Sequence, residues 1–239
     1  MIRIPVPPGA LRPGKLELPE AESRRARTVL RLEVGDAVEL FDGAGLAAPA
    51  RVSAMTDVVT VDVGPVREAG RAPPLCIAQA LAKGEKMELV IQKATELGAA
   101  EIVPFASARA VVKLDAAKAH ERVSRWRKIA QEAARQCGRA DTPEIAELAT
   151  LDAVLARPGA CGLLYEGATD VRLGAFLDAA GDAPVTMLIG PEGGFTEDEV
   201  ARSRAAGAAI VGLGARILRT ETVALAALAI ALHRRGELG

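Results

Sequence analysis

Short apolar runs of strand length fill the first part of the chain. They are VEL at 38–40, ARVSAM at 50–55 and VVTVDVG at 58–64. Gly-Asp, Asp-Gly and Thr-Asp pairs punctuate these runs, and such pairs favour turns between strands. The segment EAGRAPP at 68–74 then combines glycine with two prolines, which suits neither a helix nor a strand. The pattern predicts a small β-rich domain over residues 1–70 and a second domain over residues 71–239.

Beyond this linker, buried strands alternate with helical segments. The helical segments include EKMELVIQKATELG at 85–98, which ends on a glycine, and a basic stretch over about 115–137. The apolar, strand-like runs are LCIAQAL at 75–81, AEIVPF at 100–105, CGLLY at 161–165, VTMLIG at 185–190 and AAIVGLG at 208–214. Alternation of this length predicts an α/β domain with a mostly parallel sheet, whose ligands bind beyond the carboxyl ends of the strands.

Composition excludes several classes of protein. The 239 residues are half hydrophobic and include three cysteines and two histidines, which disfavours a disulfide framework, a metal centre and a Ser/His/Asp triad. The first residues, MIRIPVPPGALRPG, carry prolines where a signal peptide needs an apolar run. The longest apolar run, at 223–232, falls short of the roughly 20 residues that span a bilayer. We therefore expect a cytoplasmic protein with no membrane span and no metal.

Positive charge gathers in the middle of a chain whose formal net charge is only −1. Residues 109–139 hold nine basic and three acidic side chains. Such a segment would attract a phosphate backbone, but a solvated, arginine-rich helix face explains it as well. Charge alone leaves both interpretations open.

The segment LIGPEGG at 188–194 carries the strongest chemical signal. A buried strand ends there in a glycine-rich loop, and Thr196 with Glu199 forms a T-x-x-E capping box that starts the next helix. The loop matches no phosphate-binding motif, and Glu192 would repel a phosphate. A ligand with a neutral adenine, ribose hydroxyls and a positive centre fits better, and S-adenosylmethionine has these parts. As a bare pattern, a purely structural turn remains the simpler explanation.

A second polar cluster opens the apolar helix of the segment LGARILRTETVALAAL, at 213–228. Arg219, Thr220 and Glu221 stand at its start, just after a predicted strand end. On its own this cluster is explained by a capped core helix in which Arg219 pairs with Glu221 near the positive end of the dipole.

Taken together, these blocks resemble the small-subunit (16S) ribosomal RNA uridine-N3 methyltransferases, the RsmE family of the SPOUT superfamily. The resemblance covers nearly the whole chain. The blocks are VLRLEVGDAVELFDG at 29–43, KGEKMELVIQKATELG at 83–98, RQCGR at 135–139, LIGPEGGFTEDE at 188–199 and LGARILRTETVAL at 213–225.

The resemblance implies a PUA-like β-barrel that helps to hold RNA, and a SPOUT-type α/β domain with a C-terminal trefoil knot. It implies a homodimer that acts on 16S rRNA within the small ribosomal subunit. The residues expected to bind S-adenosylmethionine are Leu164, Tyr165, Glu166, Ile189, Gly190, Pro191, Glu192, Gly193, Gly194, Leu213, Gly214, Ile217, Leu218 and Thr220.

Chemistry at the base is assigned first to Arg219, whose cation would stabilise the N3 anion, and second to Glu221. The expected RNA contacts are Arg25, Arg31, Lys83, Lys86, Arg109, Arg135 and Arg139. The family often has a histidine near the position of Arg25, so this sequence departs from the pattern there. Two alternatives stay open: a SPOUT enzyme that methylates a ribose 2′-hydroxyl or another base, and a non-catalytic RNA-binding assembly factor.

Overall fold

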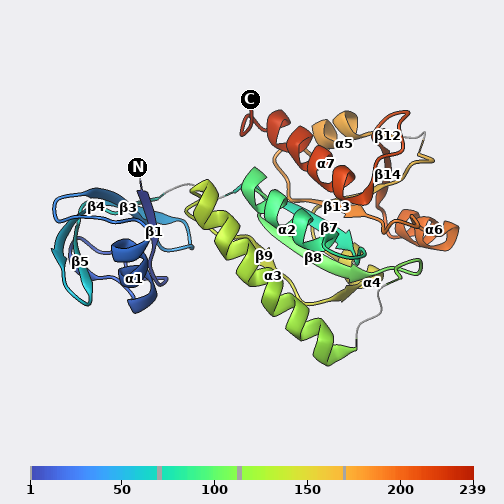
Figure 1. The fold of residues 1–239 in the computed structure, drawn as a ribbon. Helices are drawn as coiled ribbons and strands as arrows, with labels where there is room; N and C mark the ends of the chain where they lie inside the picture. Colours follow the sequence, from blue (N-terminus) through green and yellow to red (C-terminus); the bar gives the residue numbers. More distant parts are fainter. Residues whose placement is uncertain (1, 69–71, 112–114, 169–170) are drawn as a thin grey trace. The chain divides into compact units, whose positions relative to one another are not determined.

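The computed structural model describes residues 2–68, 72–111, 115–168 and 171–239 (Figure 1). The predicted domain boundary at residues 70 and 71, and Lys113 of the basic segment, lie outside the described residues. The chain folds into two compact units. The first unit comprises the residues up to 71 together with 134–142, and the second comprises 72–133 together with 143–239. Each unit has its own hydrophobic core.

The first unit is built on a six-stranded mixed sheet in the order β1-β3-β4-β5-β2, with β6 paired to β4. Among the described strands, β1 and β3 pair in parallel and the other pairs are antiparallel. Its elements are β1 (Ile2–Pro5), β2 (Gly14–Glu17), α1 (Glu20–Thr28), β3 (Ala37–Phe41), β4 (Leu46–Met55), β5 (Val59–Val63) and β6 (Arg67–Glu68). The predicted β-rich character of the N-terminal part is confirmed.

Residues 134–142 belong to this first unit although they follow much later in the chain. They comprise the last turn of α3 (Ala116–Cys137) and the segment after it. The Arg135 guanidinium lies 3.4 Å from the carboxylate of Glu22, which is buried on α1. Gly43 forms a bridge with Asp141, and Asp141 also holds Arg139 at 2.9 Å. Both arginines at the ends of the RQCGR block therefore form ion pairs within this unit.

The second unit contains a parallel sheet in the order β10-β8-β7-β13-β11-β14-β12, with β9 paired to β8. The strands are β7 (Leu75–Ala80), β8 (Glu101–Ala106), β9 (Glu144–Ile145), β10 (Ala149–Thr150), β11 (Ala160–Leu164), β12 (Val171–Arg172), β13 (Val185–Ile189) and β14 (Ala209–Gly212). The helices are α2 (Lys86–Leu97), α3, α4 (Leu151–Leu155), α5 (Leu173–Ala180), α6 (Glu197–Ala205) and α7 (Thr220–Arg234). The predicted parallel α/β architecture is confirmed.

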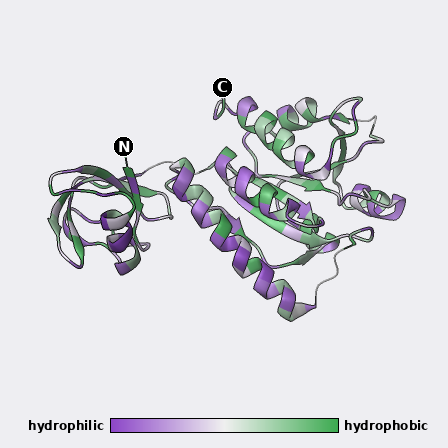
Figure 2. Ribbon diagram, viewed as in Figure 1, coloured by the Kyte–Doolittle hydropathy of each residue, from purple (hydrophilic) through white to green (hydrophobic). Residues whose placement is uncertain are grey.

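Burial explains the apolar runs of this unit. Every residue of β7 and β13 is buried, as expected for central strands of a sheet covered on both faces. The apolar run at 223–232 forms α7, which packs against α2 and α5. Figure 2 shows hydrophilic residues along much of α3, whose buried side presents Val123, Trp126 and Ala130 to the core. No helix of the described residues is long and apolar enough to cross a membrane. The trefoil knot stays a prediction.

Candidate functional site

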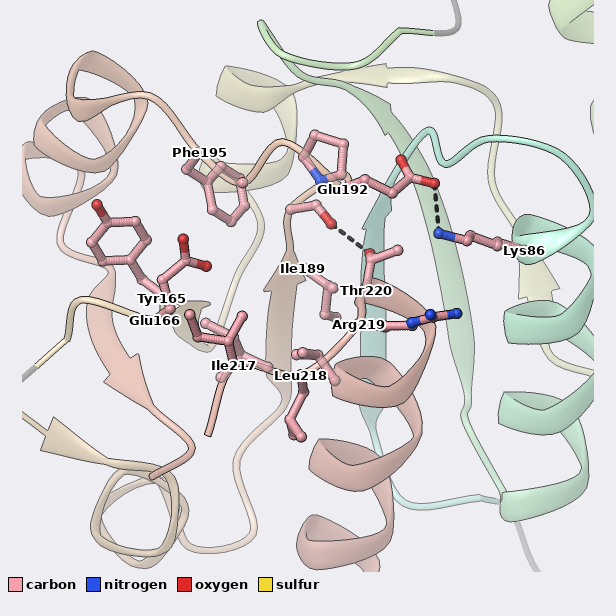
Figure 3. A pocket seen from close by; sticks show the side chains of 15 residues that line it. Lys86, Tyr165, Glu166, Ile189, Glu192, Phe195, Ile217, Leu218, Arg219 and Thr220 are labelled. Atoms are coloured by element: carbon pink, nitrogen blue, oxygen red, sulfur yellow. Dashed lines mark hydrogen bonds and ion pairs between the residues drawn. The ribbon is translucent and has the colours of Figure 1, made fainter. Parts of the chain in front are cut away.

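A cavity of about 370 Å³ opens at the carboxyl ends of the central strands of the second unit (Figure 3). Its walls are the loops that follow β11 and β13, the segment that precedes α7, and the first residue of α2. This is the edge at which parallel α/β sheets bind ligands. Four segments far apart in the sequence therefore contribute to one pocket.

Most of the residues expected to bind the methyl donor line this cavity. They are Leu164, Tyr165, Glu166, Ile189, Gly190, Pro191, Glu192, Gly194, Ile217, Leu218 and Thr220. Leu213 and Gly214 line a smaller neighbouring cavity of about 50 Å³, which shares Leu164, Tyr165, Glu166 and Leu218 with the first. Gly193 lines neither, and its carbonyl oxygen instead accepts a hydrogen bond of 3.0 Å from Arg109.

The start of helix α6 fixes one end of the loop after β13. Thr196 caps α6: its hydroxyl accepts a hydrogen bond of 3.1 Å from the Glu199 backbone N–H, and the Glu199 carboxylate accepts one of 2.9 Å from the Thr196 N–H. Gly194 has a φ of 68°, which L side chains rarely adopt. The predicted capping box is confirmed, and it sets how the loop backbone faces the pocket.

Glu199 also reaches a neighbouring loop. Its carboxylate accepts a hydrogen bond of 2.8 Å from the Ala108 N–H. Burial alone would raise the pKa of Glu199, but the N–H groups of Thr196 and Ala108 stabilise the ionised form and hold this pKa below its usual value. One carboxylate thus ties the segment before Arg109 to the start of α6.

A buried polar chain joins two walls of the site to strand β7. Gln79, fully buried on β7, donates from Nε2 to the Thr220 hydroxyl at 2.8 Å, and that hydroxyl donates to the Gly190 carbonyl oxygen at 2.6 Å. Gln79 was not anticipated from the sequence. The available signal was a single amide side chain within the apolar run LCIAQAL, because buried polar groups are kept where they have a hydrogen-bonding task.

Charged side chains gather at one end of the cavity. The Lys86 ammonium lies 3.0 Å from Glu192 and 3.6 Å from Glu221, and the Lys83 backbone N–H donates to Glu192 at 3.0 Å. Burial alone would raise the pKa of Glu192, but hydrogen bonds from its own N–H, from Lys86 and from the Lys83 N–H lower it below its usual value. The hydrogen bond to Glu192 correspondingly raises the pKa of Lys86.

The two residues assigned to chemistry at the base occupy different places. Arg219 lines the cavity, and its guanidinium forms no hydrogen bond or ion pair with any residue that the structure describes. Glu221 does not line it: the side chain is 14% exposed, and its Oε2 is buried with no hydrogen-bond partner in the described part of the chain. Glu166, on the opposite wall, is like Arg219 unpaired among the described residues.

The expected RNA contacts fall into two groups. Lys83, Lys86 and Arg109 surround the cavity of the second unit, and Arg109 is exposed. The other four belong to the first unit. There Arg31 is exposed, and Arg25 lies 3.4 Å from Glu22, which also pairs with Arg135; Arg139 pairs with Asp141.

Two cavity residues were not anticipated from the sequence. Phe195 and Val223 complete the apolar walls. Phe195 stacks on Phe105 of β8 with ring centroids 6.4 Å apart, so the residue after LIGPEGG anchors the loop to the sheet. No group of three or more potential metal-ligating side chains occurs within the described ranges.

Comparison with known proteins places this geometry in a family. Residues 70–232 match a family model described as an RNA methyltransferase domain, and residues 18–58 match one described as an RNA methyltransferase PUA domain. The chain is 37% identical over 211 residues to the ribosomal RNA small subunit methyltransferase E of Bacillus subtilis, covering 84% of this chain and 82% of the relative. It is 36% identical over 227 residues to that of Mycobacterium bovis, with coverages of 87% and 82%.

Solved structures agree. The ribosomal RNA small subunit methyltransferase E of Neisseria gonorrhoeae, bound to S-adenosyl methionine, superposes with a TM-score of 0.87 at 29% identity and 98% coverage of both chains. The methyltransferase Lpg2936 of Legionella pneumophila, in complex with the same cofactor, gives 0.83 at 34% identity, covering 98% of this chain and 97% of that one. From these matches along almost its whole length, the chain belongs to the ribosomal RNA small subunit methyltransferase E (RsmE) family.

Proposed function

We propose that this protein transfers a methyl group from S-adenosylmethionine to N3 of a uridine in 16S rRNA, within the small ribosomal subunit. The observation that carries the proposal is the cavity at the carboxyl ends of β11 and β13, which joins an apolar half to a charged half. The relatives named above are small-subunit rRNA methyltransferases, and two similar solved structures hold the donor.

The residues present fit this donor. Leu164, Ile189 and Leu218 offer apolar surface for an adenine ring, and the loop backbone offers peptide groups for its polar edge. The carboxylate of Glu166 faces the cavity without a partner among the described residues, so it can balance a positively charged group of the ligand. When bound, S-adenosylmethionine supplies an electrophilic methyl group on a positively charged sulfur.

Catalysis on this scaffold consists mainly of positioning and electrostatics. Uridine N3 must lose its proton, its lone pair then forms the new N–C bond, and the C–S bond breaks with its electron pair remaining on sulfur. Arg219 lines the cavity with its guanidinium unpaired among the described residues, so it is placed to stabilise the N3 anion or the uracil oxygens. Because N3 lies on the Watson–Crick edge, the target base must be unpaired or extruded.

RNA binding is assigned to both parts of the chain. Residues 1–70 serve as the RNA-binding domain, with Arg31 and Arg25 as phosphate contacts, and residues 71–239 serve as the methyltransferase domain, with Lys83 and Arg109 at the rim of the cavity. A knotted C-terminal segment, a homodimer and a cytoplasmic location complete the proposal. Light scattering on the purified protein measures the dimer directly.

The experiment is methyl transfer to small ribosomal subunits purified from a strain that lacks this protein. We expect one methyl group per subunit, placed on uridine N3 by mass spectrometry of the nuclease-digested RNA. A methyl group on a ribose 2′-oxygen or on another base would replace the N3 assignment. Donor binding by calorimetry without any methyl incorporation would instead support a non-catalytic assembly factor.

A further inference from the structure

Lys86 links three elements around the charged end of the cavity. It is the first residue of α2, and its ammonium group lies 3.0 Å from Glu192 on the loop after β13 and 3.6 Å from Glu221 in the first turn of α7. Figure 3 shows Lys86 turned toward Glu192, with the Arg219 side chain extending to the same side of the cavity. The side chain of Lys86 is only 31% exposed, so this lysine is part of the pocket wall.

The charges at this end balance only if Lys86 is present. Glu192 and Glu221 contribute two negative charges, and Lys86 and Arg219 two positive ones. Glu221 depends on Lys86 in particular, because its buried Oε2 accepts no hydrogen bond from any described residue. Removing the ammonium group would leave a net negative charge beside the place where a uracil anion must form.

We infer that Lys86 is a positioning residue for methyl transfer, which orients the Glu192 carboxylate and neutralises Glu221, so that the charged end of the cavity accepts the N3 anion. This inference rests on the proposed function and refines it. It also replaces the expectation that Lys86 binds the RNA backbone, since its ammonium group is already engaged by two carboxylates of the pocket.

The contacts of Glu192 and Glu221 argue against either carboxylate as the base that takes the N3 proton. The Oε1 of Glu192 accepts from both the Lys83 N–H and the Lys86 ammonium, which lowers the basicity of this carboxylate. Glu221 does not line the cavity and pairs with Lys86. With Glu166 assigned to the positive group of the donor, the N3 proton leaves to solvent water in this proposal, and Glu192 and Glu221 act by pairing with the lysine.

The other charged side chains near Lys86 are paired, exposed or on the opposite wall. On α2, Glu88 is paired with Arg125 at 2.9 Å. Before α2, the side chains of Lys83 and Glu85 are exposed, where solvent screens their charges. Across the cavity, Glu166 belongs to the wall that carries Tyr165, away from Lys86 (Figure 3).

The test compares Lys86→Met with Lys86→Arg and with Lys93→Met. Lys93 is a matched control because it lies on the same helix and pairs with Glu96 at 2.8 Å, away from the cavity lining. The measurements are the single-turnover rate of methyl transfer as a function of pH, the calorimetric Kd for S-adenosylmethionine, and the melting temperature.

For Lys86→Met we expect a rate about tenfold to hundredfold lower at neutral pH, because one electrostatic contribution to the transition state is lost. The midpoint of the rise of the rate with pH should move to a higher pH by about one unit. A nearby cation favours the anion of a titrating group, and the variant has lost this cation. The Kd for the donor should stay within about threefold. Lys86→Arg should recover most of the rate, and Lys93→Met should match the wild type.

A second variant separates charge balance from structure. Adding Glu221→Gln to Lys86→Met removes the unbalanced carboxylate, so we expect the double variant to regain at least about fivefold in rate. Two results would overturn the inference. One is an unchanged rate and pH dependence in Lys86→Met. The other is a lower rate in Lys86→Met that comes with no shift in pH dependence and that the added Glu221→Gln does not restore. If Lys86→Met fails to fold, Glu221→Gln alone carries the test and should move the pH dependence downward. Inactive wild-type protein would instead refute the proposed function.

Discussion

The hydroxyl of Thr220 donates a hydrogen bond of 2.6 Å to the carbonyl oxygen of Gly190. The first residue of α7 is thereby joined to the first residue of the loop after β13. Gln79 completes the link from β7, with 2.8 Å between its Nε2 and the Thr220 oxygen. Since these groups are buried or nearly so, each lost partner leaves a polar atom that water does not readily reach.

Replacing Thr220 by valine keeps the shape of the side chain and removes the hydroxyl. We expect the free energy of unfolding to fall by about 1–2 kcal/mol, because Gln79 and the Gly190 carbonyl each lose a partner. Donor binding should weaken by about fivefold to thirtyfold as the loop after β13 loses its link to α7. Urea denaturation and calorimetry measure the two effects.

Thr220→Ser and Thr28→Val are the controls for that experiment. Serine keeps the hydroxyl and should stay close to the wild type. Thr28 is exposed at the end of α1, where its hydroxyl donates to the Arg24 carbonyl oxygen of the same helix. Equal loss of donor affinity in the Thr28 and Thr220 variants would contradict a specific role for Thr220.

The ionised Glu199 carboxylate should make the second unit less stable at low pH. Its pKa in the folded protein is lower than in the unfolded chain, so its stabilising effect is present above about pH 4.3, the unfolded value, and is lost as the pH falls through the folded value. Glu199→Gln should therefore be about 1 kcal/mol less stable at pH 7, and this difference should shrink on acidification. Urea denaturation between about pH 3 and pH 7 measures it.

Glu197→Gln is the matched control for Glu199, since Glu197 is an exposed residue in the first turn of the same helix. It should lower stability much less, and its difference from the wild type should hardly vary with pH. A constant deficit of Glu199→Gln across the whole pH range would argue against an ionised cap.

The sequence predicted the sheet and most of the cavity because both depend on local signals. Mostly apolar runs marked β7 and β13, and the pair Thr196 and Glu199 marked the start of α6. The loops at the ends of these strands could be placed in one site because parallel strands share a carboxyl edge. The family resemblance then supplied Leu164 to Glu166, which no local motif singled out.

The contacts between distant segments could not be predicted in this way. Lys86 looked like an exposed phosphate contact, since nothing near it in the sequence shows that Glu192 and Glu221 lie within 4 Å. Arg135 likewise looked free, whereas it pairs with Glu22, more than 100 residues earlier. The partner of a charged side chain depends on tertiary structure, and the charge pattern alone cannot supply it.

Arg31 and Arg135 should differ in what they contribute to RNA binding. Arg31 is exposed, and Arg31→Ala should reduce the slope of log affinity against log salt by about one. Arg135→Ala should mainly lower stability, because it removes a cation from the buried Glu22. Filter binding of a 16S rRNA fragment at several salt concentrations separates the two effects.

Backbone strain provides an internal control at Arg31. Its φ of 50° lies in the left-handed region. Arg31→Gly should thus raise the free energy of unfolding by about 1 kcal/mol while reducing the salt slope as Arg31→Ala does. An unchanged salt slope in both variants would remove Arg31 from the RNA-binding surface.

Arg219 offers the most direct test of chemistry at the base. Since Arg219 lines the cavity and its guanidinium is unpaired among the described residues, Arg219→Ala should lower the rate of methyl transfer by about 10²–10³-fold, with the Kd for S-adenosylmethionine within about threefold. Arg219→Lys keeps the charge but loses the planar fork, so an intermediate rate is expected. Arg234→Ala, which breaks an exposed pair with Asp178 at the other end of α7, should leave the rate unchanged. If donor affinity and rate fell together in Arg219→Ala, the arginine would belong to the donor half of the cavity, and the cation at N3 would have to be sought elsewhere.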